Sequence, residues 1–458
     1  MNRSSRSQKS VLPCPFPAGV IPDAEWEEIC DCLTRPPEKA IRLRPEAALG
    51  QGVQSEFPFR NEPVPWFDSL EFGRGRFLCE EFQPGKFLHH AAGIYYIQDA
   101  GSMLALRLLE LRPSEVIADL CAAPGAKASA ILEMVGPGSG WLLANEPIRG
   151  RIPALEYSLA RTGFPRYAVT SRDPSELEHA FPHSFDAVLV DAPCTGQTLV
   201  SRGKQNVAAF SAAQIEHSAA RQRRILSHAA GMVRPGGRIV YSTCTFAFEE
   251  NEGVIAAFLS EHPSWGVEEC PSLERWKSPF APGGYRLWPH RDRCAGAYAV
   301  RLRCFTTDLS KTRFTEKQAG ASMPHSTARL RTSPWDHEDV GMLRDALIET
   351  RGKQRFGWAA GIPKAWIDVA SSGPEVAFQP ASFWLPSHSL ALRRDGGWTP
   401  HQAVELSDSD AIRYIQGNAL PSVGLGWFVA TWNHHPLGWL HSNAQRANNS
   451  LPTAARQR

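Results

Sequence analysis

The stretch FDAVLVDAPCTG, residues 185–196, decides the fold of this 458-residue chain. Its apolar run at residues 187–190 contains two valines and predicts a strand that is buried on both faces. Pro193 ends the strand because proline has no N–H group to donate. Asp191 and Cys194 therefore follow the carboxyl end of a parallel strand, which is the edge where open α/β sheets bind their ligands.

Two other stretches have the same organisation. In VIADLCAAPGAK, residues 116–127, an apolar run ends at Asp119, and a turn of small residues leads into a helical pattern. In RIVYSTCTFAFEEN, residues 238–251, a third apolar run ends just before Cys244. Small residues let a backbone approach a ligand closely, and a helix N-terminus offers unpaired N–H groups. The turn has neither the dinucleotide-binding nor the phosphate-loop glycine pattern, which disfavours the alternative of a nucleotide-dependent enzyme on a doubly wound sheet.

These three motifs, in this order and spacing, resemble the nucleotide-binding, fourth and sixth motifs of the RNA 5-methylcytosine methyltransferases of the NOL1/NOP2/Sun family. The resemblance extends over residues 12–303 and, more weakly, into the C-terminus. It implies an α/β fold with a Rossmann-like class I methyltransferase sheet, S-adenosylmethionine as the cofactor and RNA as the partner. It also implies that Cys244 attacks the base and that Cys194 assists product release. Spacing alone does not rank the two thiols, and DNA cytosine methyltransferases use the Pro-Cys thiol instead.

The expected reaction explains why two thiols and an acid are needed. Carbon 5 of cytosine is a poor nucleophile until a thiolate adds to carbon 6. Asp191 is the candidate donor near ring nitrogen 3, and Lys127 matches the lysine of the family's first motif. The sequence departs from the family at Ala126, where a second glycine is usual, and at Gln197-Thr198, which puts the shape of the substrate loop in doubt more than the reaction.

Acidic residues end four successive predicted strands, at Asp119, Glu146, Asp173 and Asp191. Glu146 is placed to hold ribose hydroxyls, and Asp173 to accept from an adenine amino group. For each acid the alternative is a helix N-cap or a solvated loop position. A series of carboxylates favours a positively charged sulfonium over a phosphate-bearing cofactor. The predicted cofactor-binding residues are Cys121, Ala122, Ala123, Pro124, Gly125, Ala126, Lys127, Glu146, Asp173 and Asp191.

The length of the chain predicts several parts. We expect a disordered tail at 1–12, a small mixed, RNA-binding-like N-terminal domain at 13–113, the methyltransferase core at 114–305, a linker at 306–334 and a C-terminal domain at 335–458. Within the N-terminal domain, residues 63–66 are expected in a packed loop, and His89-His90 in a structural or RNA-facing role. The C-terminal domain holds eight of the fourteen tryptophans, and its ending resembles that of the small-subunit ribosomal RNA methyltransferase F group, which carries a PUA-like RNA-binding barrel.

The composition indicates the partners and the cellular compartment of the protein. The net charge of +2 is nearly neutral, but residues 192–248 contain seven Lys and Arg against one acid, which suits a polyphosphate backbone. No stretch is long and apolar enough to span a membrane. The ten cysteines have the spacing of neither a disulfide framework nor a zinc site, so we expect no metal and a reducing cytoplasm.

The sequence therefore predicts a monomeric enzyme that methylates a cytosine of RNA, with 16S ribosomal RNA as the expected target. Two alternatives remain open. One is a transfer RNA cytosine-C5 methyltransferase, and the other is an inactive RNA-binding ribosome assembly factor. The intact thiols and strand-end acids argue against an inactive protein.

Overall fold

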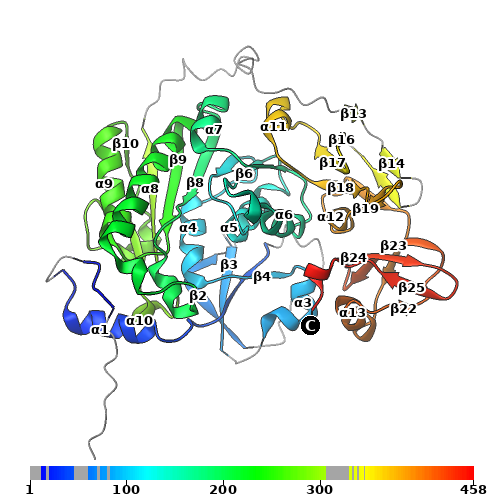
Figure 1. Ribbon diagram of the computed structural model, residues 1–458, viewed down its shortest axis with the longest axis horizontal. Helices are drawn as coiled ribbons and strands as arrows, with labels where there is room; N and C mark the ends of the chain where they lie inside the picture. Colours follow the sequence, from blue (N-terminus) through cyan, green and yellow to red (C-terminus); the bar gives the residue numbers. More distant parts are fainter. Residues whose placement is uncertain are drawn as a thin grey trace, which may run out of the picture.

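The computed structural model describes residues 12–16, 20–45, 60–69, 73–79, 83–305, 330–332, 335–337, 340–344 and 346–457. The expected tail, except for its last residue, and most of the expected linker lie outside these ranges. In Figure 1 the chain runs from a blue N-terminal region through a cyan and green central sheet to a yellow and red C-terminal region.

The central sheet has the strand order β10-β12-β9-β8-β5-β6-β7, with β11 paired to β12. Its strands are β5 (Val116–Asp119), β6 (Trp141–Asn145), β7 (Tyr167–Thr170), β8 (Phe185–Asp191), β9 (Val233–Thr243), β10 (Trp265–Val267), β11 (Tyr285–Leu287) and β12 (Ala297–Cys304). Strands β5 to β9 are parallel to one another. Because β12 runs antiparallel to both β9 and β10, the whole sheet is mixed.

Both faces of this sheet are covered by helices. Along β8, Ala187 and Leu189 join one apolar cluster while Val188 and Val190 join the other, so successive side chains enter opposite cores. The helices are α4 (Met103–Leu109), α5 (Ala126–Val135) and α6 (Ile152–Ala160) on the first face, and α7 (Pro174–Ala180), α8 (Ala212–Met232) and α9 (Glu252–Glu261) on the second. This double covering is the reason why the strands read as continuous apolar runs.

The N-terminal region packs against the first face. It contains α1 (Asp23–Cys32), the sheet β2-β3-β1-β4 and the short helix α3 (Leu88–Ala91). Its strands are β1 (Ala40–Leu43), β2 (Asn61–Ser69), β3 (Gly73–Leu78) and β4 (Tyr95–Ile97). The prediction of a loop at residues 63–66 is wrong, because they lie in β2. This strand tolerates its prolines since it is the edge of the sheet and its pairing is irregular there.

The C-terminal region is built into the core rather than appended to it. Its strands and helices are β13 (Leu330–Thr332), β14 (Trp335–His337), β15 (Gly341–Leu343), β16 (Ala346–Arg351), β17 (Gln354–Ala359), α11 (Lys364–Val369), β18 (Glu375–Phe378), β19 (Leu385–Pro386), α12 (His388–Ala391), β20 (Trp398–Pro400), β21 (Ala403–Glu405), α13 (Asp408–Ile415), β22 (Leu420–Pro421), β23 (Gly426–Trp432), β24 (His435–Ser442) and β25 (Arg446–Asn449). Trp366 of α11 packs its ring against Trp141, Phe181 and Phe185 of the methyltransferase core, with centroid distances of 5.9–6.3 Å. The tryptophans Trp358, Trp366, Trp398, Trp432 and Trp439 are all buried. Most described tryptophans of this region therefore serve the core.

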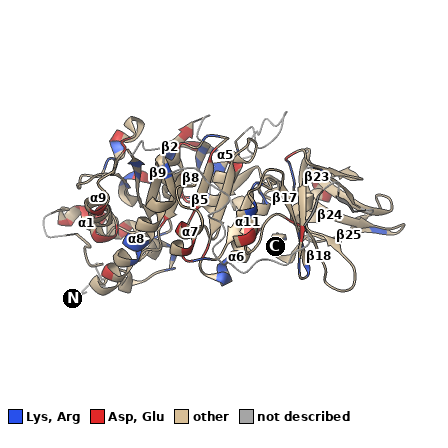
Figure 2. Cartoon of the chain, turned by 90° about the horizontal axis from the view of Figure 1, so that it is seen from above, with Lys and Arg blue, Asp and Glu red and all other residues tan. Residues whose placement is uncertain are grey.

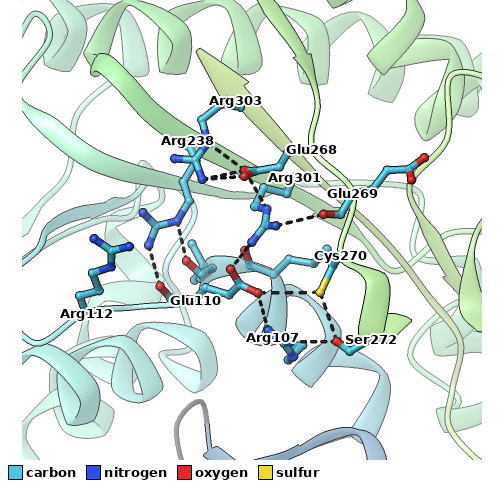
Figure 3. A network of polar contacts seen from close by, with 12 residues as sticks. Arg107, Glu110, Arg112, Arg238, Glu268, Glu269, Cys270, Ser272, Arg301 and Arg303 are labelled. Carbon is cyan, nitrogen blue, oxygen red and sulfur yellow. Dashed lines mark hydrogen bonds and ion pairs between the residues drawn. The ribbon is translucent and has the colours of Figure 1, made fainter. Parts of the chain in front are cut away.

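Acidic and basic residues are interspersed along the chain (Figure 2). Part of the basic segment predicted to face RNA is structural. Arg238 is buried and donates to both carboxylate oxygens of Glu115, at 2.8 and 2.7 Å. It belongs to a network of arginines and carboxylates that joins α4, β9 and β12 (Figure 3). Arg202, Arg224 and Arg234 pair with Asp99, Asp173 and Asp186 but are exposed, as are Lys204, Arg221 and Arg223.

Within the described residues, no helix has both the length and the apolar character needed to cross a membrane.

Candidate active site

The two cysteines named from the sequence lie together. Strands β8 and β9 are parallel neighbours with Asp191 opposite Ser242, so the loops that follow them leave the sheet side by side. The Sγ atoms of Cys194 and Cys244 are 3.3 Å apart, and both side chains are partly exposed. Sequence positions 50 residues apart thus form one pair of thiols at the carboxyl edge of the sheet.

The two thiols differ in their protonation. The hydrogen bond with the Cys194 thiol lowers the pKa of Cys244, against the opposing effect of burial, and the positive charge of Lys127 acts in the same direction. The same hydrogen bond, together with burial, raises the pKa of Cys194 well above its ordinary value. These opposite shifts favour Cys244 over Cys194 as the thiolate.

Lys127 and Asp191 form an ion pair beside the thiols. The Nζ atom of Lys127 is 2.7 Å from Oδ2 of Asp191, and the Ser242 hydroxyl donates to Oδ1 at 2.7 Å. Burial lowers the pKa of Lys127, but the charge and hydrogen bond of Asp191 outweigh burial and raise it overall. Lys127 is thus a fixed cation, held by the last residue of β8.

Asp119 lies at the end of β5, next to β8, where the strand order reverses. Its side chain is 1% exposed, and its Oδ2 atom has no hydrogen-bond partner among the described residues. Burial, reinforced by the charge of Asp191, raises the pKa of Asp119 to about 8. Its Oδ1 atom accepts from the Cys121 N–H at 3.3 Å. A buried carboxylate with one free oxygen fits a cationic ligand, because a positive charge would restore the ionised form.

The turn between β5 and α5 is shaped by packing as well as by any ligand. Gly125 has φ +106°, and a Cβ atom there would lie 2.4 Å from Cβ of Ser158 on α6. Only glycine fits that position. The Ser158 hydroxyl donates to the Pro124 carbonyl at 2.7 Å, and Arg151 donates to the Ala123 carbonyl at 2.6 Å. The predicted cofactor turn is thus held from outside by α6.

Glu146 and Asp173 are partly occupied by local contacts. Glu146 follows β6 directly, is 2% exposed, and accepts from the Ile148 N–H at 3.0 Å. Its other oxygen lies 3.0 Å from Arg151 as an ion pair without the alignment of a hydrogen bond. Asp173 lies three residues beyond β7, where it forms the N-cap of α7 in a reciprocal capping box with Glu176. Asp173 is therefore an N-cap, which was the alternative interpretation of this residue. The contact of Asp173 with an adenine amino group stays a prediction.

Three family models match parts of the chain. Residues 106–303 match the family model described as 16S rRNA methyltransferase RsmB/F. Residues 18–100 match the N-terminal domain of 16S rRNA methyltransferase RsmF, and residues 401–457 match the methyltransferase RsmF PUA domain. The ribosomal RNA small subunit methyltransferase F of Salmonella arizonae is 32% identical over 93% of this chain and 92% of its own length.

The chain belongs to the ribosomal RNA small subunit methyltransferase F family.

Other relatives carry the same name. The Aeromonas hydrophila protein is 27% identical over 93% of this chain and 92% of its own length. The Klebsiella pneumoniae protein is 32% identical over 61% of this chain and 60% of its own length. A methyltransferase homolog protein from Pyrococcus horikoshii is similar in fold, with a TM-score of 0.52, 24% identity and coverage of 61% of this chain and 90% of its own.

Membership in this methyltransferase F family confirms the family resemblance, the methyltransferase fold and the assignment of the chain as an RNA methyltransferase. The individual roles of Cys244, Cys194, Asp191, Lys127 and the cofactor-binding residues stay predictions. The ten cysteines are all free, and no group of His, Cys, Asp and Glu in the described residues could hold a metal ion.

The sequence analysis missed Glu250, which joins the two cysteine loops. Its fully buried carboxylate accepts from the Thr195 N–H at 3.0 Å and from the Thr195 hydroxyl at 2.5 Å. It also accepts from the Thr245 hydroxyl at 3.3 Å and from Gln222 at 2.8 Å. Thr195 and Thr245 each follow one of the cysteines. The signal in the sequence was the pair of glutamates near the end of the third motif, Glu249 and Glu250, but the motif did not show which of them points inward.

Glu250→Gln should lower kcat for methyl transfer by about 10- to 100-fold, with the cofactor KM within a few-fold of wild type. The glutamine amide would point its N–H groups at the donors that now bind the Glu250 carboxylate. The lost hydrogen bonds would destabilise the arrangement of the two cysteine loops by about 1–3 kcal/mol. Steady-state kinetics measure kcat and KM separately. The matched control is Glu249→Gln, because Glu249 is an exposed neighbour. Equal kcat values for the two variants would show that Glu250 does not position the thiols.

Asp119→Asn should make the stability of the cofactor-free protein less sensitive to pH. The folded-state pKa of Asp119 is raised to about 8, whereas an unfolded aspartate titrates near about 4. Folding takes up a proton between these values, so wild-type stability falls as pH rises through this window, by up to about 1.4 kcal/mol per pH unit. Asparagine does not titrate, and the variant should gain relative stability from about pH 5 to about pH 8. Unfolding midpoints of both proteins measure this, and a constant difference across the window would contradict the burial of an acid here.

Proposed function

We propose that this chain transfers a methyl group from S-adenosylmethionine to carbon 5 of a cytosine in 16S ribosomal RNA, through a covalent bond between Sγ of Cys244 and carbon 6. The observation that carries the proposal is the pair of thiols 3.3 Å apart beside Lys127 and Asp191, in a member of the methyltransferase F family. The substrate class is supported by the 16S rRNA methyltransferase models that match the chain.

The residues present fit the cofactor. Asp119 and Glu146 supply buried carboxylates, each with an oxygen that accepts no hydrogen bond from described residues. The turn at residues 121–127 leads into the N-terminus of α5, where the first N–H groups have no partner within the helix. When bound there, S-adenosylmethionine supplies an electrophilic methyl group on a sulfonium, whose positive charge the carboxylates favour.

Residues of the protein carry out the remaining steps at the cytosine ring. The Cys244 thiolate adds to carbon 6 and makes carbon 5 nucleophilic. Asp191 donates at ring nitrogen 3 when it is protonated, and the Lys127 ammonium 2.7 Å away stays charged and holds the Asp191 side chain in place. The Cys194 thiol first passes its proton to solvent water, and the resulting thiolate then accepts the one proton that carbon 5 loses per turnover. Breaking the bond between carbon 6 and sulfur returns the thiolate to Cys244.

The target base is expected to be single-stranded or flipped out of its stack, because a stacked base does not reach the thiols. Two free thiols in contact would also need a reducing compartment, so we propose that the enzyme works in the cytoplasm.

Methyl incorporation from labelled S-adenosylmethionine tests the proposal. Small ribosomal subunits, free 16S RNA and transfer RNA are offered as substrates, and the labelled nucleoside is identified after digestion. The expected product is 5-methylcytidine in 16S RNA. Label in transfer RNA alone would favour the transfer RNA alternative. RNA binding without label in any substrate would favour the inactive assembly factor.

A further inference from the structure

A cavity of about 300 Å³ lies where three parts of the chain meet. It is lined by α3 of the N-terminal region, by the end of α6 in the methyltransferase core, and by the tail after β25. Figure 1 shows the red C-terminal end of the chain beside α3. The contact is direct, because Gln457 donates to the Phe87 carbonyl at 3.4 Å. Each of these parts belongs to a different domain model of the family.

The cavity is positively charged. Lys86, Arg161 and Arg456 line it, and none of the described residues that line it is an acid. His90 and His388 also line it, and both stay neutral near pH 7. Burial, followed by the charge of Arg161, lowers the pKa of His90 to about 3 and that of His388 to about 4. Three cations therefore face one space without a carboxylate, an arrangement that an anion would stabilise.

The cavity lies close to the predicted cofactor turn. Ser158 of α6 donates to the Pro124 carbonyl of that turn, and Arg161 follows Ser158 by three residues. Three residues of helix correspond to a rise of about 5 Å. Tyr157 adds a ring to the cavity, with the Arg161 guanidinium 5.9 Å from its centroid. Aromatic rings and guanidinium planes are the surfaces on which unstacked bases rest.

We propose that this cavity binds one unstacked nucleotide of the substrate RNA, with its phosphate on Lys86, Arg161 and Arg456 and its base against Tyr157. The proposal rests on the proposed function, because it takes the RNA substrate from there. The volume suits this occupant, since it lies at the small end of ligand pockets and has room for one nucleotide rather than a duplex. A nucleotide held here would fix the strand that leads to the target cytosine.

The test uses the full chain with Lys86→Glu and Arg456→Glu together. Both side chains are exposed, so the fold should tolerate the change. The matched control is Arg35→Glu with Arg275→Glu, which has the same net charge and lies at exposed positions outside the cavity. Binding of single-stranded 16S RNA fragments is measured across salt concentrations. We expect the cavity variant to bind at least about 10-fold more weakly than the control, with a log–log salt slope shallower by about one.

Equal affinity and slope in the two variants would overturn the proposal. A titration with uridine monophosphate separates the two sources of a nucleotide. Saturable binding that the cavity variant loses, with RNA binding unchanged, would identify a site for free nucleotides and would also overturn the proposal. Because these measurements need no methyl transfer, they remain informative if the proposed reaction fails, and methyl incorporation by the wild type reports that failure separately.

Discussion

Cys244→Ala should reduce methyl transfer to RNA by more than about 10³-fold while S-adenosylmethionine binds within a few-fold of wild type. The thiol serves the base, whereas the cofactor is expected at the turn of residues 121–127 and at Glu146. Removing a nucleophile removes the covalent step rather than weakening a contact, which explains the size of the effect. Labelled methyl incorporation and calorimetric cofactor titration measure the two quantities.

Cys304→Ala is the matched control for this substitution. Cys304 lies on β12 of the same sheet, is buried, and is far in sequence from both cysteine loops. Its loss should leave the rate near wild type. A Cys244→Ala enzyme that still transfers methyl groups near the wild-type rate would contradict the assignment of the nucleophile.

Cys194→Ala should accumulate the covalent complex between protein and RNA. Attack by Cys244 remains possible, but the group assigned to take the carbon 5 proton is gone. A denaturing gel should show a slower, RNA-linked band for Cys194→Ala and none for Cys244→Ala or for the double variant. The reversed pattern would make Cys194 the nucleophile.

The structure refines this expectation. The hydrogen bond with Cys194 is the main influence that lowers the pKa of Cys244, so its removal should raise that pKa. Adduct formation in Cys194→Ala should therefore be slow at neutral pH and should accelerate as pH rises. Cys194→Ser, which keeps a donor at this position, should form the adduct faster near pH 7 than Cys194→Ala does.

Much of this site could be predicted from the sequence because its determinants are local. Each strand of the site is a short apolar run that ends in an acid or a turn, and parallel strands place their carboxyl ends on one edge. Asp191 beside Cys194, and Gly125 just before α5, were visible in single motifs. Placing Cys194 against Cys244 required only that β8 and β9 be neighbours, which the structure shows.

Contacts between distant segments could not be predicted in the same way. Nothing near Arg238 in the sequence indicates that Glu115, 123 residues earlier, pairs with it and removes it from the surface. The residues that flank Trp366 in the sequence are a mixture of polar and apolar residues typical of any helix. In the structure, however, Trp366 packs against Phe185 in the core. Glu250 was distinguishable from Glu249 only once both cysteine loops had been placed around it.

The central claim is the bond between Sγ of Cys244 and carbon 6 of cytosine. Wild-type enzyme incubated with S-adenosylmethionine and 16S RNA containing 5-fluorocytidine tests it directly, because a fluorine on carbon 5 leaves no proton for release and the complex persists. After nuclease and protease digestion, mass spectrometry should find a modified nucleotide on the peptide that contains Cys244. A nucleotide on the peptide that contains Cys194, or no linked nucleotide in a complex shown to bind this RNA, would contradict the account.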